Sequence, residues 1–281
     1  MQQASQPPFG TFSLPPVASG LLWLSRRSFL GRGKWRQWVY SAIRSMHDKP
    51  VDTTFWGVPI RIDPRTNLVE RKPMLRLDRT DVKERKIMHA ALSKAGSVLV
   101  DIGANMGLYS FDAVINGPEN VRVVAIDPQP PMIDRFTFNL ANMREEKVRG
   151  VDNIQFFPVA VGREEGTLRF TNDGPEHMGH VVEEGGIEVP VRTLLDILDE
   201  AKIDRIDCLK IDIEGHEGDA LGPFLREAPD NLVPECVLIE YCTHGHWSED
   251  IFALMKQRGM EEVERFNLNA VWKKTQTNEN R

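Results

Sequence analysis

The chain is poor in cysteine and has no long apolar run. Its 281 residues include only Cys208, Cys236 and Cys242, with no CxxC pair and no zinc-finger spacing. We therefore expect buried, reduced thiols in a cytoplasmic protein, and neither a disulfide framework nor a zinc site. No apolar stretch approaches the roughly 20 residues of a membrane-spanning helix, so no such helix is expected.

Acidic residues are missing from one part of the chain. Residues 1–47 contain no Asp or Glu, whereas the remaining 29 of the 35 bases face all 41 acids, a net charge of −12 for residues 48–281. This acidic balance argues against nucleic acid as a partner, because phosphate contacts need Lys and Arg. The six bases of the first segment are Arg26, Arg27, Arg32, Lys34, Arg36 and Arg44.

The basic segment also holds Trp23, Trp35, Trp38 and Tyr40. Two interpretations of residues 17–47 stay open. The favoured one is a helical arm packed by its aromatics, as a lid or against a second copy in a homodimer. The other is peripheral contact with an anionic membrane surface. No apolar stretch follows the twin arginines of this segment, so an export signal is not expected.

Strands and helices alternate along most of the chain, which is typical of a parallel α/β sheet. A mobile Pro- and Ser-rich tail is expected over residues 1–16, and an edge strand or hairpin over Thr53–Ile62. A helix is expected from Asp81 to about Leu92. The expected boundary separates a tail and basic helical arm, 1–52, from a domain over 53–281. The expected strands are 97–102, 121–127, 153–158, 206–211 and 236–241, and the helices are 107–116, 131–143, 193–201, 216–226 and 248–258.

Two segments depart from the alternation. Residues 162–191 read as a β-hairpin inserted after the third strand. Glu261–Phe266 and Ala270–Lys273 read as two strands joined tightly, and such a joint forces an antiparallel pair. The predicted fold class is α/β: a Rossmann-like, seven-stranded, mostly parallel sheet with an inserted β-hairpin and an N-terminal extension.

An acid and two glycines end the first expected strand. Asp101 closes the strand, and Gly103 and Gly107 form a tight loop before a helix. Ligands of open α/β sheets bind at this edge, and glycines remove side chains where a ligand must approach the backbone. Asp127 ends the second strand, where a carboxylate can accept both hydroxyls of a ribose.

The loop lacks the dinucleotide fingerprint GxGxxG. From Gly103, that pattern requires glycine at two positions where this chain has Asn105 and Leu108. The second glycine lets a pyrophosphate approach, so NAD is disfavoured. S-adenosylmethionine has no phosphate and is compatible with this loop.

Five stretches, in one order, resemble the FkbM-type S-adenosylmethionine-dependent methyltransferases: 100–110, 125–128, 158–162, 189–194 and 209–217. The resemblance covers about residues 55–273. It implies a class I methyltransferase fold, S-adenosylmethionine as cofactor, and methyl transfer to a hydroxyl of a sugar, polyketide or related small metabolite. Two positions depart from the family: Asp127 replaces the usual Glu, and His216 replaces a residue that is often small or apolar. The predicted cofactor-binding residues are Asp101, Gly103, Ala104, Asn105, Gly107, Ser110, Asp127, Pro128, Val159 and Ala160.

A charged run ends the fourth expected strand. Strand alternation puts Lys210, Asp212 and Glu214 on one face, and charges in a core are costly, so Asp212 is expected to face the cleft. For Lys210 and Glu214, two interpretations are equally favoured: a position in the cleft, or an ion pair between the two side chains that fixes the loop. Asp212, aided by His216, is the candidate that orients or deprotonates the acceptor hydroxyl, and Glu240 is a second. His216 also fits a surface residue at a helix start.

No metal site is expected. The clustered histidines, His177 with His180 and His244 with His246, lack cysteine or carboxylate partners at matching spacing. A metal-independent O-methyltransferase is the leading prediction. The alternatives are a non-catalytic binding protein on an S-adenosylmethionine fold and, least favoured, an NAD-type oxidoreductase.

Overall fold

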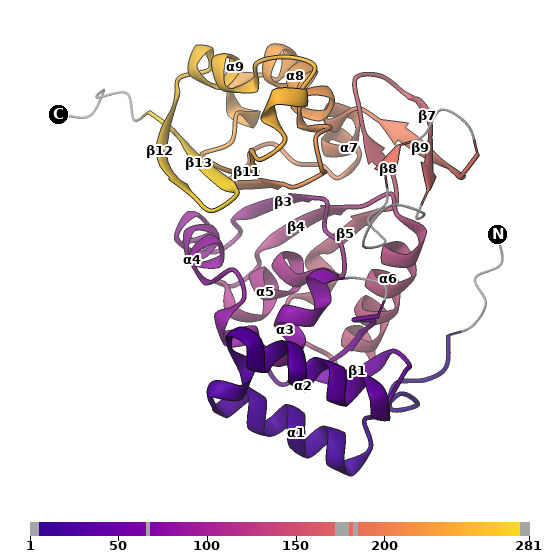
Figure 1. Ribbon diagram of the computed structural model, residues 1–281. Helices are drawn as coiled ribbons and strands as arrows, with labels where there is room; N and C mark the ends of the chain where they lie inside the picture. The colour runs from indigo at the N-terminus through magenta and orange to yellow at the C-terminus, as the bar shows by residue number, and fades with distance from the viewer. Residues whose placement is uncertain (1–5, 66–67, 172–179, 182–184, 276–281) are drawn as a thin grey trace. The chain divides into compact units, whose positions relative to one another are not determined.

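The computed structural model (Figure 1) describes residues 6–65, 68–171, 180–181 and 185–275. Its described residues divide into two compact units. The first contains 6–82 and 134–148, and the second contains 83–133, 149–171 and the described residues from 180 onward. We describe each unit by itself, and the predicted boundary between residues 52 and 53 stays a prediction.

The second unit is built on seven strands: β3 (Val98–Ile102), β4 (Arg122–Ile126), β5 (Ile154–Phe157), β10 (Cys208–Ile211), β11 (Cys236–Glu240), β12 (Met260–Phe266) and β13 (Asn269–Lys274). They form one sheet in the order β12-β13-β11-β10-β3-β4-β5 (Figure 1). The five strands from β11 to β5 pair in parallel, whereas β13 is antiparallel to both of its neighbours. This arrangement confirms the predicted fold class.

Helices cover both faces of this sheet. On one face lie α4 (Val82–Ala91) and α5 (Leu108–Asn116), and on the other α7 (Leu194–Glu200), α8 (Glu217–Glu227) and α9 (Ile251–Gln257) (Figure 1). Every residue of β3, β10 and β11 is buried, as strands covered on both faces require. One buried cluster joins strand residues such as Val100 and Ile211 to Ile197 of α7 and Phe224 of α8. The helix α6 (Pro130–Glu145) follows β4 and contributes to the first unit from residue 134.

Chain order reverses between β3 and β10. From β3 the chain proceeds outward through β4 to β5, and it later returns to β10 on the other side of β3. Loops that leave two such neighbouring strands diverge, and ligands bind at the carboxyl edge of this position. Asp101 and Lys210 are register partners on these two strands, so both lie where a ligand is expected.

A second, four-stranded sheet replaces the expected single hairpin. It contains β6 (Ala160–Val161), β7 (Gly166–Thr171), β8 (His180–Val181) and β9 (Ile187–Arg192), in the order β6-β9-β7-β8. The strands β7 and β9 form the predicted antiparallel hairpin, with β6 added in parallel to β9 and β8 added to β7. Both added strands are two residues long, too short for side-chain alternation to reveal them in a sequence.

The cysteines follow the expectation in part. Cys208 and Cys236 are buried free thiols on β10 and β11, whereas Cys242 is exposed. The prediction of a buried thiol at Cys242 is wrong because β11 ends at Glu240, before this residue.

The first unit contains α1 (Pro16–Arg27), α2 (Gly33–Met46), α3 (Arg71–Arg76) and the hairpin of β1 (Val51–Phe55) with β2 (Val58–Ile62). The hairpin confirms the prediction for Thr53–Ile62. Its turn residues Trp56 and Gly57 both have left-handed φ, of 51° and 83°, which suits a two-residue hairpin turn. Within the described part of the chain, no helix combines the length and apolar character needed to span a bilayer.

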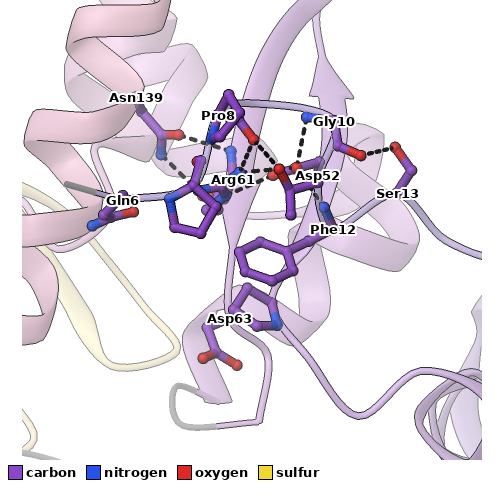
Figure 2. A network of polar contacts seen from close by, with 12 residues as sticks. Gln6, Pro8, Gly10, Phe12, Ser13, Asp52, Arg61, Asp63 and Asn139 are labelled. Atoms are coloured by element: carbon purple, nitrogen blue, oxygen red, sulfur yellow. Dashed lines mark hydrogen bonds and ion pairs between the residues drawn. The ribbon is translucent and has the colours of Figure 1, made fainter.

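A buried ion pair in this hairpin fixes the residues that precede α1 (Figure 2). Arg61 Nε lies 2.7 Å from Asp52 Oδ1, and both side chains are at most 3% exposed. Asp52 also accepts the N–H groups of Gly10 and Phe12, and Arg61 donates to two carbonyls of the same stretch. The expected mobile tail is therefore wrong for residues 6–16, which polar groups of a remote hairpin hold in place.

Replacing Asp52 by Asn removes the counter-charge of a buried guanidinium. The rings of Phe12 and Phe138 stack against the Arg61 guanidinium carbon, at 4.7 and 3.9 Å, and keep it from turning toward solvent. We expect Asp52→Asn to lower the free energy of unfolding by about 3–5 kcal/mol, as breaking a buried ion pair does. Urea denaturation followed by circular dichroism measures the change.

The matched control is Asp48→Asn, which breaks the ion pair with Arg44, whose side chains are 48% and 69% exposed. We expect a loss below about 1 kcal/mol there. Equal losses in the two variants would contradict a structural role for the buried pair.

Candidate active site

The glycine loop between β3 and α5, residues 103–107, uses its N–H groups within the chain. Those of its first two residues donate to the Ile126 carbonyl at 2.9 and 3.0 Å, and that of Asn105 donates to Asp127 Oδ2 at 2.7 Å. The last two donate to the Asn105 amide oxygen and the Ala104 carbonyl. A pyrophosphate at such a loop is held by backbone N–H groups. The contacts therefore support the predicted preference against NAD.

Glycine is required at two positions of this loop because neighbouring atoms of the protein leave no room for a side chain. Gly103 and Gly107 have φ of 77° and 94°, in the left-handed region. A Cβ at Gly103 would lie 2.1 Å from the Asp212 carbonyl oxygen, and one at Gly107 would lie 2.4 Å from the Phe111 ring. The space expected for an approaching ligand is thus filled by the loop after β10 and by the first turn of α5.

Asp101 is fully buried at the carboxyl edge of β3. Its Oδ2 accepts the Ser110 hydroxyl at 2.7 Å, while Oδ1 has no hydrogen-bond partner in the described structure. Lys210 Nζ lies 3.8 Å from Oδ1. Burial raises the pKa of Asp101, and Lys210 opposes this shift. The unsatisfied oxygen can accept a hydrogen bond from a ligand. Ser110 is itself fully buried and contacts Asp101.

Asp127, just after β4, ties the glycine loop to the next turn. It is 2% exposed, and its two oxygens accept the N–H groups of Asn105 and Gln129. Burial raises its pKa to about 6. Each carboxylate oxygen has a second lone pair, so a ribose hydroxyl can still bind there.

The other predicted cofactor residues follow two neighbouring strand ends. The N–H group of Asp127 donates to the Phe157 carbonyl at 3.3 Å, so Pro128 and Val159 lie just beyond hydrogen-bonded segments. Val159 and Ala160 are 8% and 6% exposed, and Pro128 is half-buried. The set predicted for the cofactor therefore lies along the ends of β3, β4 and β5.

Three acids meet beyond β10 and β11 in what we call the carboxylate cluster: Asp212, Glu214 and Glu240. One oxygen of each lies within 4.8 Å of the others. Asp212 and Glu214 are exposed, whereas Glu240 is 8% exposed and its Oε2 has no hydrogen-bond partner in the described structure. Burial and the neighbouring acids raise the pKa of Glu240 to about 8 and also raise that of Glu214. Within the cluster, Glu240 therefore has a pKa in the range that suits a general base at neutral pH.

Strand alternation does not explain this cluster. The strand β10 ends at Ile211, and Glu214 lies in a turn with φ of 54°. The predicted shared face is therefore wrong beyond the strand end, although the turn still brings Glu214 to Asp212. Lys210 lies between two acids, 3.8 Å from Asp101 and 3.6 Å from Asp212.

Glu217 shapes the turn, a role that sequence reasoning missed. Its buried carboxylate accepts the N–H groups of Ile213 and Gly215, each at 3.0 Å, and the indole N–H of Trp247 at 2.7 Å. The available signal was an acid at the first position of a helix, where backbone N–H groups are unpaired. Glu217 thus fixes the backbone that presents Asp212 and Glu214.

The histidines lie apart from these contacts. His216 Nδ1 is 3.9 Å from Asp219 Oδ2, and its side chain is 45% exposed, which fits the alternative of a surface residue. His244 Nδ1 contacts the Tyr241 carbonyl at 2.7 Å, and His177 lies outside the described residues. Among the described residues, the carboxylate cluster is the set close enough to share a metal ion, and the expected absence of a metal stays a prediction.

Comparisons with known proteins point to one family. The family model described as "Methyltransferase FkbM domain" matches residues 101–261. Among solved structures, a methyltransferase FkbM from Methylobacillus flagellatus KT is 17% identical, with a TM-score of 0.44 over 73% of this chain and 54% of that chain. The chain therefore spans about half the length of that protein. A comparison with curated proteins gave no match.

Two further solved structures are similar at lower identity. Precorrin-6y C5,15-methyltransferase from Geobacter metallireducens GS-15 is 12% identical, with a TM-score of 0.39 over 69% of this chain and 87% of that chain. The M. jannaschii TYW2 in complex with AdoMet is 12% identical, with a TM-score of 0.37 over 80% of this chain and 87% of that chain.

Substituting Gly103 tests the backbone contact behind the site. A Cβ there would overlap the Asp212 carbonyl, and φ is left-handed, so we expect Gly103→Ala to lower the free energy of unfolding by at least about 2 kcal/mol. The control is Gly166→Ala at the start of β7, where a Cβ meets no atom within 4 Å. We expect a change below about 0.5 kcal/mol there. Thermal unfolding compares the two, and a stable Gly103→Ala variant would refute the close contact.

Proposed function

The chain belongs to the family of FkbM methyltransferase domains, and from this premise we propose that it is an S-adenosylmethionine-dependent methyltransferase acting on a hydroxyl group. One observation carries the proposal. At the switch point of the sheet, Asp101, a buried acid with one oxygen that accepts no hydrogen bond in the described structure, lies close to the carboxylate cluster, with Lys210 between them. The arrangement joins a site for a cationic cofactor to a base.

The residues at the strand ends fit this cofactor. S-adenosylmethionine carries an ammonium group, a ribose and no phosphate. The orphaned Asp101 Oδ1 is an acceptor suited to the ammonium group, and Asp127 retains lone pairs for ribose hydroxyls. The glycine loop, with its N–H groups already donated, does not require a phosphate. When bound, the cofactor supplies a methyl group activated on a sulfonium.

Glu240 is the residue that we assign as the general base. The acceptor oxygen would bond the methyl carbon as the methyl–sulfur bond breaks and S-adenosylhomocysteine leaves, and Glu240 accepts the proton that the hydroxyl loses. Its pKa of about 8 gives it a much higher proton affinity than an ordinary carboxylate while leaving part of it ionised at neutral pH. Asp212, the exposed neighbour, accepts a hydrogen bond from the acceptor and orients it. The acceptor class is a sugar, polyketide or related small metabolite.

Calorimetry tests the cofactor. We expect S-adenosylmethionine and S-adenosylhomocysteine to bind and NAD not to bind. Asp101→Asn keeps an acceptor for Ser110 but removes the charge, so we expect its affinity for S-adenosylmethionine to fall about tenfold or more. The exposed Asp204→Asn is the matched control and should bind normally. Binding of neither sulfur compound would refute the proposal, and binding without turnover would indicate a non-catalytic protein.

The pH dependence of turnover tests the base. Glu240 must be ionised to accept a proton, so kcat/KM, which reports the free enzyme, should rise with pH and level off above about 8. Glu240→Gln should lower kcat by about 10²–10⁴-fold and abolish this rise.

The raised pKa of Glu240 also affects stability. The folded state binds the proton more tightly than the unfolded chain, so the free energy of unfolding falls as pH rises toward 8.

The assay follows S-adenosylhomocysteine released with a panel of sugar and polyketide acceptors, with and without EDTA. We expect no effect of the chelator. An unchanged pH limb in Glu240→Gln would exclude this residue as the base. Loss of activity with EDTA and recovery with Mg²⁺ would instead assign the carboxylate cluster to a metal.

A further inference from the structure

The helices α1 and α2 carry exposed apolar side chains that the proposed active site does not use. Seven of the thirteen large hydrophobic residues exposed in the described structure lie between residues 17 and 46. Three of them are tryptophans, each more than half exposed. These aromatics therefore do not pack the arm within its own chain. We call the seven residues the arm surface: Val17, Trp23, Leu24, Phe29, Trp35, Trp38 and Met46.

On α1 the exposed apolar residues share one side. Val17 and Leu24 are two turns apart, with Trp23 beside them, whereas Ala18 and Leu22 on the opposite side are buried. The helix therefore has two apolar sides, one in the interior of its unit and one in solvent. Monomeric proteins rarely leave such contiguous apolar surface uncovered without a function.

On α2 the arrangement repeats. Trp35 and Trp38 are one turn apart on its exposed side, while Val39 and Ile43 are buried. The two helices lie side by side (Figure 1), and the ring of Phe29, between them in sequence, meets Trp35 edge-on at 5.9 Å. An aromatic side chain of the segment between the helices therefore adjoins one of α2.

Exposed cations occur in the same segment as these aromatics. Arg27, Arg32, Lys34 and Arg36 are exposed, and none forms an ion pair with a residue that the structure describes. The Arg27 guanidinium lies 4.6 Å from the centre of the Trp23 ring. No acid occurs in residues 1–47 to neutralise them. The arm surface is thus apolar, and the segment that carries it is strongly basic.

This combination decides among the occupants. A second copy on a two-fold axis would place like charges opposite one another, which is unfavourable. Nucleic acid would match the cations but leave the aliphatic residues Val17 and Leu24 uncovered. Anionic lipid matches both, because tryptophan favours the headgroup level, aliphatic chains enter the acyl boundary, and Lys and Arg attract anionic headgroups. We propose that the arm surface docks on a membrane containing anionic phospholipid.

Sedimentation with vesicles tests the full-length protein. We expect it to pellet with vesicles of phosphatidylcholine and phosphatidylglycerol in equal parts, to bind phosphatidylcholine alone weakly, and to dissociate as salt rises. Tryptophan emission should shift to shorter wavelength when anionic vesicles are added, and brominated lipid should quench it. Failure of the unaltered protein to bind anionic vesicles overturns the proposal.

Paired variants locate the contact. Lys34→Gln should weaken partitioning about fivefold, the contribution of one cation at an anionic surface. The double variant Trp35→Ser and Trp38→Ser should weaken it about tenfold or more. The controls remove groups of the same kind from the second unit. Lys94→Gln removes an exposed cation, and the double variant Val263→Ser with Leu268→Ser removes two exposed apolar side chains of the β12–β13 hairpin. They should change partitioning less than about twofold.

The outcomes separate the alternatives. Equal weakening in arm and control variants would exclude the arm surface as the contact. A dimer in light scattering that the tryptophan variants dissolve would assign the surface to a second copy, and tighter binding to a single-stranded oligonucleotide than to vesicles would assign it to nucleic acid. Circular dichroism confirms that each variant folds, which is expected because every substituted side chain is exposed.

Discussion

The candidate site depends on a backbone contact between the loop after β3 and the loop after β10. The Asp212 N–H donates to the Ile102 carbonyl at 3.1 Å, and the missing side chain of Gly103 lets the Asp212 carbonyl approach. The contact lies at the switch point of the sheet, where a strand from the first half of the chain pairs with one formed about a hundred residues later. The pairing of β3 with β10 sets Asp101 opposite Lys210, and this contact extends the pairing to the loop that carries Asp212. The glycine thus assembles the site by admitting another part of the chain, and the ligand-facing groups are those that the assembly positions.

The charges brought together at this edge are unequal. Four acids, Asp101, Asp212, Glu214 and Glu240, share the ends of three neighbouring strands with Lys210, whose Nζ is within 3.8 Å of the first two. Such an edge favours a positively charged ligand, and S-adenosylmethionine is a sulfonium. A cation held beside the cluster also favours its ionised form, so it lowers the raised pKa of Glu240. In the function that we propose, cofactor binding and ionisation of Glu240 then support each other, so that the proposed base becomes active when the methyl donor is present.

The sequence predicted those parts that a local pattern encodes. Three apolar residues before Asp101 and the amphipathic run after Gly107 predicted β3 and α5, and the alternation of strands and helices predicted the sheet. The short strands β6 and β8 were not predicted because two residues are too few to show a periodic pattern. The role of Glu217 was not predicted because its partners are backbone N–H groups of a turn and the indole of Trp247, thirty residues away. The tail before α1 was mistaken for mobile because its order comes from the remote pair of Asp52 and Arg61. In each miss the determining contact is non-local or too short to leave a pattern.

The separation of charge along the chain constrains how the arm surface can act. Residues 48–281 carry a charge of −12, so most of the protein is repelled by an anionic surface and gains nothing from approaching it. The cations of residues 1–47 must overcome that repulsion within about one Debye length, and the exposed tryptophans add a contribution that salt does not screen. With cations alone, the attraction to an anionic surface would be offset by the repulsion of the acidic residues 48–281. With aromatics alone, the arm would bind neutral and anionic surfaces equally. In the docking that we propose, the presence of both on the arm would therefore produce attachment that is confined to the arm and selective for anionic lipid.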